Sequence, residues 1–257
     1  MVYFRLLGRL VLRLFLYLGE LASLVGQICE SLLQGRKRWR QFFEQIVEIG
    51  YRSQIVVIIT GGFTGAVLAT QALYQFSMVD METMGGVIVS VGMMRELGPT
   101  ITGLMLAGRV GSSMAAEIGT MRVTEQIDAL STLSTNPYKY LVAPRLLAGF
   151  TMLPCCVLVA DIIGVFGGYL ISVHKLGFNP AVYLKNTWQF LEVIDVVSGL
   201  VKAGVFGFLI ALMGCYHGYH SRGGAQGVGS ATTNAVVSAS ILILASNYLI
   251  TEAFFAQ

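Results

Sequence analysis

Charged residues are scarce in this sequence. Only 12% of the 257 residues are Asp, Glu, Lys or Arg, whereas 55% are hydrophobic. Soluble domains carry roughly 25% charged residues. Several charge-free stretches reach the roughly 20 apolar residues that a spanning helix needs. The composition therefore excludes a soluble fold and predicts an all-α integral membrane protein.

Motifs of soluble enzymes are also missing. The sequence has no G-x-x-x-x-G-K-[ST] phosphate loop, no H-E-x-x-H, no C-x-x-C and no G-x-S-x-G. No basic patch is interleaved with aromatic residues as single-stranded nucleic acid would need. The four cysteines lie in apolar surroundings without metal-ligand spacing: Cys29, Cys155, Cys156 and Cys215. We therefore expect no metal, no cofactor, no catalytic residue and no nucleic acid in this chain, and ATP, if used, must bind to another subunit.

The first 40 residues have a polar stripe and a basic cluster. Nine polar residues fall within one arc of about 100° on a helix; they are Arg5, Arg9, Arg13, Glu20, Ser23, Gln27, Glu30, Ser31 and Gln34. This pattern favours an amphipathic helix in the membrane interface, with a spanning helix as the alternative. The basic residues that follow favour the anionic cytoplasmic leaflet: Arg36, Lys37, Arg38 and Arg40.

Five apolar segments follow within residues 53–255. We predict spans over Ser53–Met78, Met84–Ser112, Leu146–Val173, Val196–Tyr216 and Ala231–Phe255. With a cytoplasmic amino terminus, most Lys and Arg residues lie inside and only Lys175 and Lys185 lie outside, so the positive-inside rule is satisfied. The carboxyl terminus is then periplasmic. An odd number of spans argues against two equal repeats, which many secondary transporters have.

Glycines mark two further features. Small residues four apart allow backbones to approach closely, and we interpret three such pairs as packing faces within the chain, with a dimer contact as the alternative. These pairs are Gly61 with Gly65, Ala107 with Gly111, and Gly164 with Gly168. The stretch from Gly223 to Gly229 is interpreted as a flexible cytoplasmic turn.

Charges inside the predicted spans indicate a functional cavity or buried pairs, because each is costly in hydrocarbon. Arg95 and Glu96 precede Pro99, which removes a helix hydrogen bond and can bend the segment. Adjacent helical residues point about 100° apart, so Arg95 and Glu96 should meet different partners. Asp161 and Lys202 either form structural pairs, including one with Glu96, or belong to a proton or ion relay.

The most specific stretch runs from Arg95 to Leu130. It contains R-E-L-G-P, then A-G-R-x-G-S, then A-E-I-G-x-M-R-x-T-E-Q-I, in that order. These blocks resemble the signature of the MlaE/YrbE permeases of bacterial phospholipid ABC transporters. The five-span plan with an amino-terminal interfacial helix agrees, so the resemblance covers nearly the whole chain as a single domain, 1–257.

The resemblance implies a homodimer in the bacterial inner membrane that maintains outer-membrane lipid asymmetry. It also implies an ATPase subunit carrying ATP and Mg, a small STAS-domain protein and a periplasmic MCE-domain lipid-binding protein. Arg95 would lie near the phospholipid headgroup, and Glu96 and Leu97 would line the lipid pocket. A guanidinium suits phosphate geometry, which supports the first assignment independently.

The resemblance further implies a cytoplasmic coupling helix between spans 2 and 3, over Glu117–Leu130, that docks on the ATPase. Its matching residues are Glu117, Ile118, Gly119, Met121, Arg122 and Glu125. The alternative for this segment is a solvated loop helix.

Other functions remain possible for the chain as a whole. One is a secondary transporter or ion relay through Asp161, Glu96 and Lys202, which would act without an ATPase. Another is an anchor for a periplasmic lipid-binding protein, with no lipid-accessible cavity. An intramembrane enzyme is least favoured, because no nucleophile and base stand out together.

Overall fold

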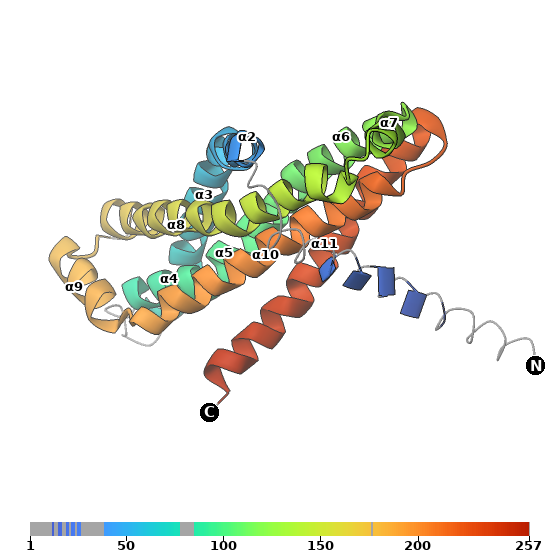
Figure 1. Ribbon diagram of the computed structural model, residues 1–257. Coiled ribbons are helices and arrows are strands. Elements are labelled where there is room, and N and C mark those ends of the chain that lie inside the picture. The colour runs from blue at the N-terminus through green and yellow to red at the C-terminus, as the bar shows by residue number, and fades with distance from the viewer. Residues whose placement is uncertain are drawn as a thin grey trace, which may run out of the picture.

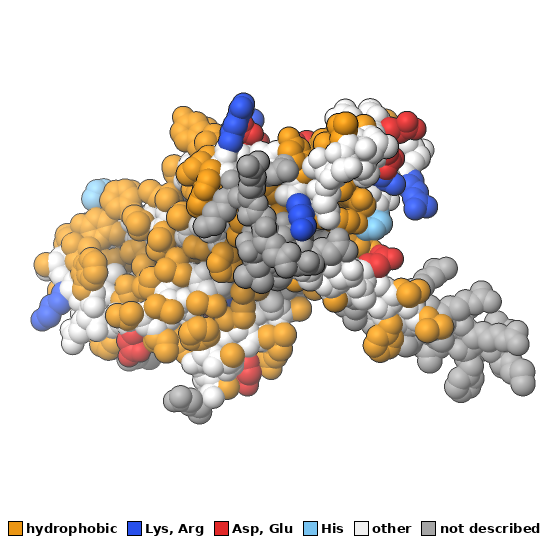
Figure 2. Space-filling model, in the orientation of Figure 1, with side chains coloured by type: hydrophobic (Ala, Val, Ile, Leu, Met, Phe, Trp, Pro, Cys, Tyr) orange, Lys and Arg blue, Asp and Glu red, His pale blue; other side chains and the backbone are white. Residues whose placement is uncertain are grey.

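The computed structural model describes residues 12, 15, 16, 19, 20, 22, 23, 25, 26, 39–77, 85–175 and 177–256, which are mostly helical and include no strand. Four helical stretches are long and apolar enough to cross a membrane: Trp39–Ala72, Tyr138–His174, Val193–Tyr219 and Gly224–Phe255. Side chains coloured as hydrophobic cover much of the visible surface (Figure 2). The predicted all-helical membrane fold is therefore confirmed.

Four long helices match predicted spans. The structure has α3 (Gln54–Ser77), α8 (Ala143–His174), α10 (Val193–Tyr219) and α11 (Gly224–Phe255). Short turns precede two of them, a 3-10 turn at Tyr51–Ser53 and a π turn at Tyr138–Val142. The glycine-rich stretch is not the flexible turn that we predicted, because α11 already begins at Gly224 and only the first two glycines have positive φ.

The second predicted span is a chain of shorter pieces. It runs through α4 (Gly85–Gly92), a π turn η3 (Met93–Leu97), α5 (Gly98–Leu106), a π turn η4 (Ala107–Gly111) and α6 (Ser112–Val123). Pro99 has no N–H to donate, so a regular helix cannot continue unchanged through this point. The segmented helix extends well beyond the predicted end at Ser112.

The predicted coupling helix over Glu117–Leu130 is not continuous. Helix α6 ends at Val123, and α7 (Gln126–Thr132) begins after a turn in which Glu125 is left-handed, with φ of 61°. A left-handed residue commonly follows a helix end, and although it is usually glycine, Glu125 takes this position here. The segment is therefore two short helices joined by a tight turn.

Two short helices were not predicted. Helix α2 (Trp39–Ile49) exposes Trp39, Phe43 and Val47 at a spacing of four residues, a pattern typical of an amphipathic helix. Helix α9 (Pro180–Phe190) joins α8 to α10 and lies at the opposite end of the molecule from α7 (Figure 1).

Glycines bring the long helices close together. A side chain at Gly61 would meet the backbone of Ala160, and one at Gly65 would meet the backbone of Gly164, where α3 crosses α8. Gly111 of η4 faces Ile210 of α10. The small-residue pairs therefore pack within the chain, as predicted.

The amino-terminal helix is described only in part. The nine described residues between 12 and 26 are helical. Most of the predicted polar stripe lies outside the described residues, and so does the basic cluster apart from Arg40.

Candidate functional site

Charged and polar side chains from three helices meet inside the bundle. Lys202 of α10 is fully buried, and its ammonium lies 2.8 Å from Oε1 of Glu96 in η3. Asn247 and Thr251, four residues apart on α11, each donate a hydrogen bond of 2.9 Å to the same carboxylate. The pair expected between Lys202 and Glu96 is thus present. We call these four residues, together with Arg95 and its acidic partner Asp195, the intramembrane cluster.

Arg95 meets a different acid from the one that holds its neighbour. Its Nε donates to Oδ1 of Asp195, which is fully buried near the start of α10. The other oxygen, Oδ2, accepts the backbone N–H of Glu192 at 3.1 Å, as in a capping box. The cap fixes the Asp195 carboxylate, which in turn fixes the guanidinium. Arg95 and Glu96 therefore have separate partners, as their spacing predicts.

The guanidinium of Arg95 is the accessible part of this cluster. Its carbon lies 4.3 Å from the centroid of the Phe255 ring, and its side chain is 35% exposed. A cation over an aromatic face is electrostatically favourable. Leu97, half-buried, packs instead against the small apolar cluster of Ala69, Val89 and Met93. Arg95 alone therefore combines a positive charge with exposure here.

Asp161 stands apart from the intramembrane cluster. It is 5% exposed on α8, and its Oδ1 has no hydrogen-bond partner among the described residues. The nearest feature is Gly98, which leaves room for this carboxyl because it has no side chain. The structural pair expected for Asp161 is absent from the described part of the chain, and no hydrogen bond or ion pair among these residues links Asp161 to Glu96 or Lys202.

The predicted coupling residues divide into buried and exposed groups. Ile118 and Gly119 are buried, and the Gly119 carbonyl accepts a hydrogen bond from Ser221. Glu117 pairs at 2.6 Å with Arg145 of α8, which is almost fully buried. Glu117 thus has a partner within its own chain.

The other coupling residues lie on or near the surface. Met121 packs at the edge of the main apolar core. Arg122 pairs at 2.5 Å with Asp128, and its guanidinium carbon lies 5.6 Å from the centroid of the Tyr219 ring. Glu125 is exposed in the turn. Acidic and basic side chains are visible at the end that carries α7 (Figure 2).

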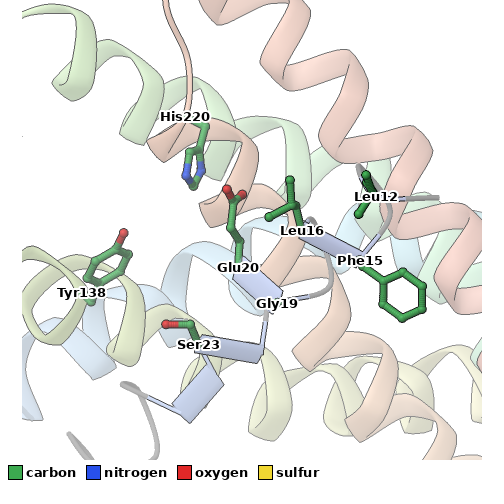
Figure 3. A pocket seen from close by; sticks show the side chains of 8 residues that line it. All are labelled: Leu12, Phe15, Leu16, Gly19, Glu20, Ser23, Tyr138 and His220. Carbon is green, nitrogen blue, oxygen red and sulfur yellow. The ribbon is translucent and has the colours of Figure 1, made fainter. Parts of the chain in front are cut away.

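A pocket of about 560 Å³ lies between the amino-terminal helix, the π turn at Tyr138–Val142 and His220, which directly follows α10. Leu12, Phe15 and Leu16 form part of its lining, and Glu20 points towards His220 (Figure 3). The Glu20 carboxylate also accepts a hydrogen bond of 2.6 Å from the Tyr216 hydroxyl. This contact attaches the amino-terminal helix to the bundle.

Sequence reasoning missed three members of the intramembrane cluster: Asp195, Asn247 and Thr251. Asn247 and Thr251 carried a usable signal, because polar residues four apart on an apolar helix share one face. Asp195 follows Glu192 at the spacing of a capping box. Among the described residues, no group of three or more metal-ligating side chains comes together.

Comparisons with known proteins agree on one family. Residues 42–253 match the family described as Permease MlaE. The chain is 52% identical over 249 residues to a probable ABC transporter permease protein of Rickettsia bellii, covering 97% of this chain and 96% of that protein. It is 42% identical to one from Synechocystis, covering 90% and 88%. It is 31% identical to the intermembrane phospholipid transport system permease protein MlaE of Haemophilus influenzae, covering 97% and 96%.

The matched region includes α3, the segmented helix, the intramembrane cluster and nearly all of α11. The chain therefore belongs to the MlaE permease family and is a multi-pass membrane permease subunit of an ABC transporter.

Proposed function

We propose that this permease moves phospholipid between the inner membrane and a periplasmic MCE-domain protein, and so maintains outer-membrane lipid asymmetry. The observation that carries the proposal is the exposed guanidinium of Arg95, set at the edge of a charged cluster inside an apolar bundle. Guanidinium binds phosphate through paired hydrogen bonds. The name of the Haemophilus relative, which specifies intermembrane phospholipid transport, supports this cargo.

We further propose five crossings, with the segmented helix from Gly85 to Val123 as the second. Its pieces pack against α3, α8, α10 and α11, which are apolar enough to cross. This topology places the amino terminus and the α6–α7 turn in the cytoplasm, and α9 and the carboxyl terminus in the periplasm. The whole chain then forms one permease unit, with residues 1–40 at the interface.

The partners proposed are a second copy of this chain, an ABC ATPase subunit that binds ATP and Mg, a small STAS-domain protein and the MCE-domain protein. The exposed apolar side chains on α11, such as Ile241, Leu244 and Tyr248, form a surface that a protein or lipid could contact. The ion-relay alternative receives less support, because Lys202 and Glu96 are paired with each other and Asp161 lies outside their contacts.

The lipid site is tested by replacing Arg95 with alanine. We expect the purified transporter to retain about tenfold less phospholipid, because charge-assisted hydrogen bonds to the phosphate are lost. Arg52, an exposed arginine paired with Glu48, provides the matched control when replaced with alanine. Mass spectrometry of bound lipid measures both variants. Equal lipid in Arg95→Ala and Arg52→Ala would contradict the assignment.

The coupling segment is tested by charge reversal at Arg122 and Glu125. We expect Arg122→Glu with Glu125→Arg to lower recovery of the ATPase with the tagged permease by about tenfold, because interface charges would face like charges. Lys185→Glu reverses an exposed charge on α9, at the opposite end, and should leave recovery unchanged. Unchanged recovery in the double variant would show that this turn does not bind the ATPase.

A further inference from the structure

We propose that Lys202 replaces the amide proton that Pro99 cannot supply, and that it is thereby the positioning residue for Arg95. Its ammonium donates a hydrogen bond of 2.8 Å to the backbone carbonyl of Arg95, in addition to its ion pair with Glu96. The structural part of this inference stands on these contacts alone. The consequence for lipid binding rests on the proposed function of Arg95.

The missing proton follows from the sequence. In an α-helix the N–H of residue 99 would donate to the carbonyl of residue 95, but proline has no N–H. One residue earlier, Gly98 donates to the carbonyl of Met93, five residues back, as in a π turn. The carbonyls of Met94 and Arg95 therefore both lose the donor that a regular helix would provide.

Helix α10 meets both of these carbonyls. Gly199 lies so close to the Met94 carbonyl that a side chain there would overlap it. Lys202, three residues further on the same face of α10, donates to the Arg95 carbonyl. Lys202 is fully buried, so water does not compete for this contact. An apolar side chain at position 202 would leave a buried carbonyl without a donor.

The same face of α10 also holds the side chain of Arg95. Asp195 precedes Lys202 by about two helical turns, and it binds the Arg95 guanidinium. Lys202 therefore fixes the backbone of Arg95 while Asp195 fixes its side chain. Glu96, the residue after Arg95, is turned towards α11, where its carboxylate is held by Asn247 and Thr251 as well as by Lys202 of α10. Together these contacts set where the guanidinium stands at the bend.

The experiment must separate the carbonyl contact from the ion pair. Lys202→Met alone would strand the Glu96 carboxylate, and Glu96→Gln alone would strand the buried Lys202 ammonium, so the two charges are either both kept or both removed. We compare the natural protein with the double variant Glu96→Gln, Lys202→Met, each with proline and with alanine at position 99. Alanine at position 99 restores an N–H that can donate to one of the freed carbonyls. Thermal unfolding and phospholipid retained per folded permease are measured for each.

We expect the double variant Glu96→Gln, Lys202→Met to unfold about 5 °C below the natural protein, because the Arg95 carbonyl loses its donor. Adding Pro99→Ala should restore most of that loss, whereas Pro99→Ala with Lys202 present should give no comparable gain. Retained phospholipid should fall and recover in parallel, which a purely structural contact far from Arg95 would not cause.

An equal effect of Pro99→Ala in the natural protein and in the double variant would overturn the role of Lys202 at the carbonyl. A midpoint that falls and recovers while retained lipid stays constant would overturn the positioning of Arg95. If Arg95→Ala itself leaves lipid unchanged, the proposed lipid site fails, but the thermal comparison of Lys202 with Pro99 still decides the contact.

Discussion

Replacing Gly65 with leucine is expected to prevent stable folding of the permease. A Cβ at this position would lie 2.7 Å from Cα of Gly164, where α3 crosses α8. The obstacle is backbone, which cannot rotate aside as a side chain can. Because helices in membranes associate largely through close packing of this kind, separating α3 from α8 should cost more than about 3 kcal/mol.

The measurement is the yield of monodisperse protein in detergent, together with the midpoint of thermal unfolding. Gly65→Ala, a smaller change, should fold but unfold about 5–10 °C earlier. Gly229→Ala on α11 is the matched control, because no atom lies within 4 Å of the added Cβ, and it should match the natural protein. Normal yield of Gly65→Leu would show that the contact between α3 and α8 is not as close as described.

Hydropathy predicts the long helices well, because a spanning helix must supply about 20 apolar residues in one run. The ends of α8 and α10 lie only a few residues from their predicted positions. The π turns of the second segment were not predictable in the same way. Pro99 marks where the helix is disturbed, but the register there also depends on how Gly199 and Lys202 of α10 pack against it.

Partners across helices were harder to predict than helix positions. Four charged residues of the spans were identified from sequence: Arg95, Glu96, Asp161 and Lys202. The sequence does not give the rotation of one helix relative to another, and this rotation decides which charges meet. Thus Lys202 could be matched to Glu96 by approximate depth. Asp195, in contrast, was placed just before its predicted span, so its pair with Arg95 was missed. Asp161 was expected to be paired, but its Oδ1 has no partner among the described residues.

Short amphipathic helices were missed because their apolar runs are too brief for a span. In α2 the periodic signal was the recurrence of Trp39, Phe43 and Val47 every four residues. In α9 the signal was the pair Asn179 and Pro180, where the Asn179 side chain accepts a hydrogen bond from the Ala181 N–H. Asn179 and Pro180 together are typical of a helix start, so they could have indicated α9 between the two spans.

Removing the carboxylate of Glu117 is expected to destabilise the cytoplasmic end of the bundle more than any other single charge change on α6. Arg145 is almost fully buried, and the described contacts give its guanidinium one acidic partner, Glu117 at 2.6 Å, and one backbone acceptor, the Leu141 carbonyl at 2.8 Å. Breaking a fully buried pair by removing one partner costs about 3–5 kcal/mol, and the cost here should be smaller because the Glu117 side chain is 54% exposed. Glu117→Ala should therefore lower the unfolding midpoint by about 5 °C.

Two further variants show whether the stranded charge is the cause. Glu117→Ala with Arg145→Met removes both charges and should recover most of the lost stability, since a neutral pair of similar volume is often tolerated. Asp128→Asn breaks the more exposed pair with Arg122 and should cost at most about 1 kcal/mol. If the double variant is as unstable as Glu117→Ala, the packing of Arg145 matters more than its charge. Glu117 could act through its pair with Arg145, through a contact with the ATPase, or through both. Recovery of the ATPase with the stable double variant separates these two roles. A loss of ATPase binding in a stable permease means that the half-exposed carboxylate also contacts the ATPase.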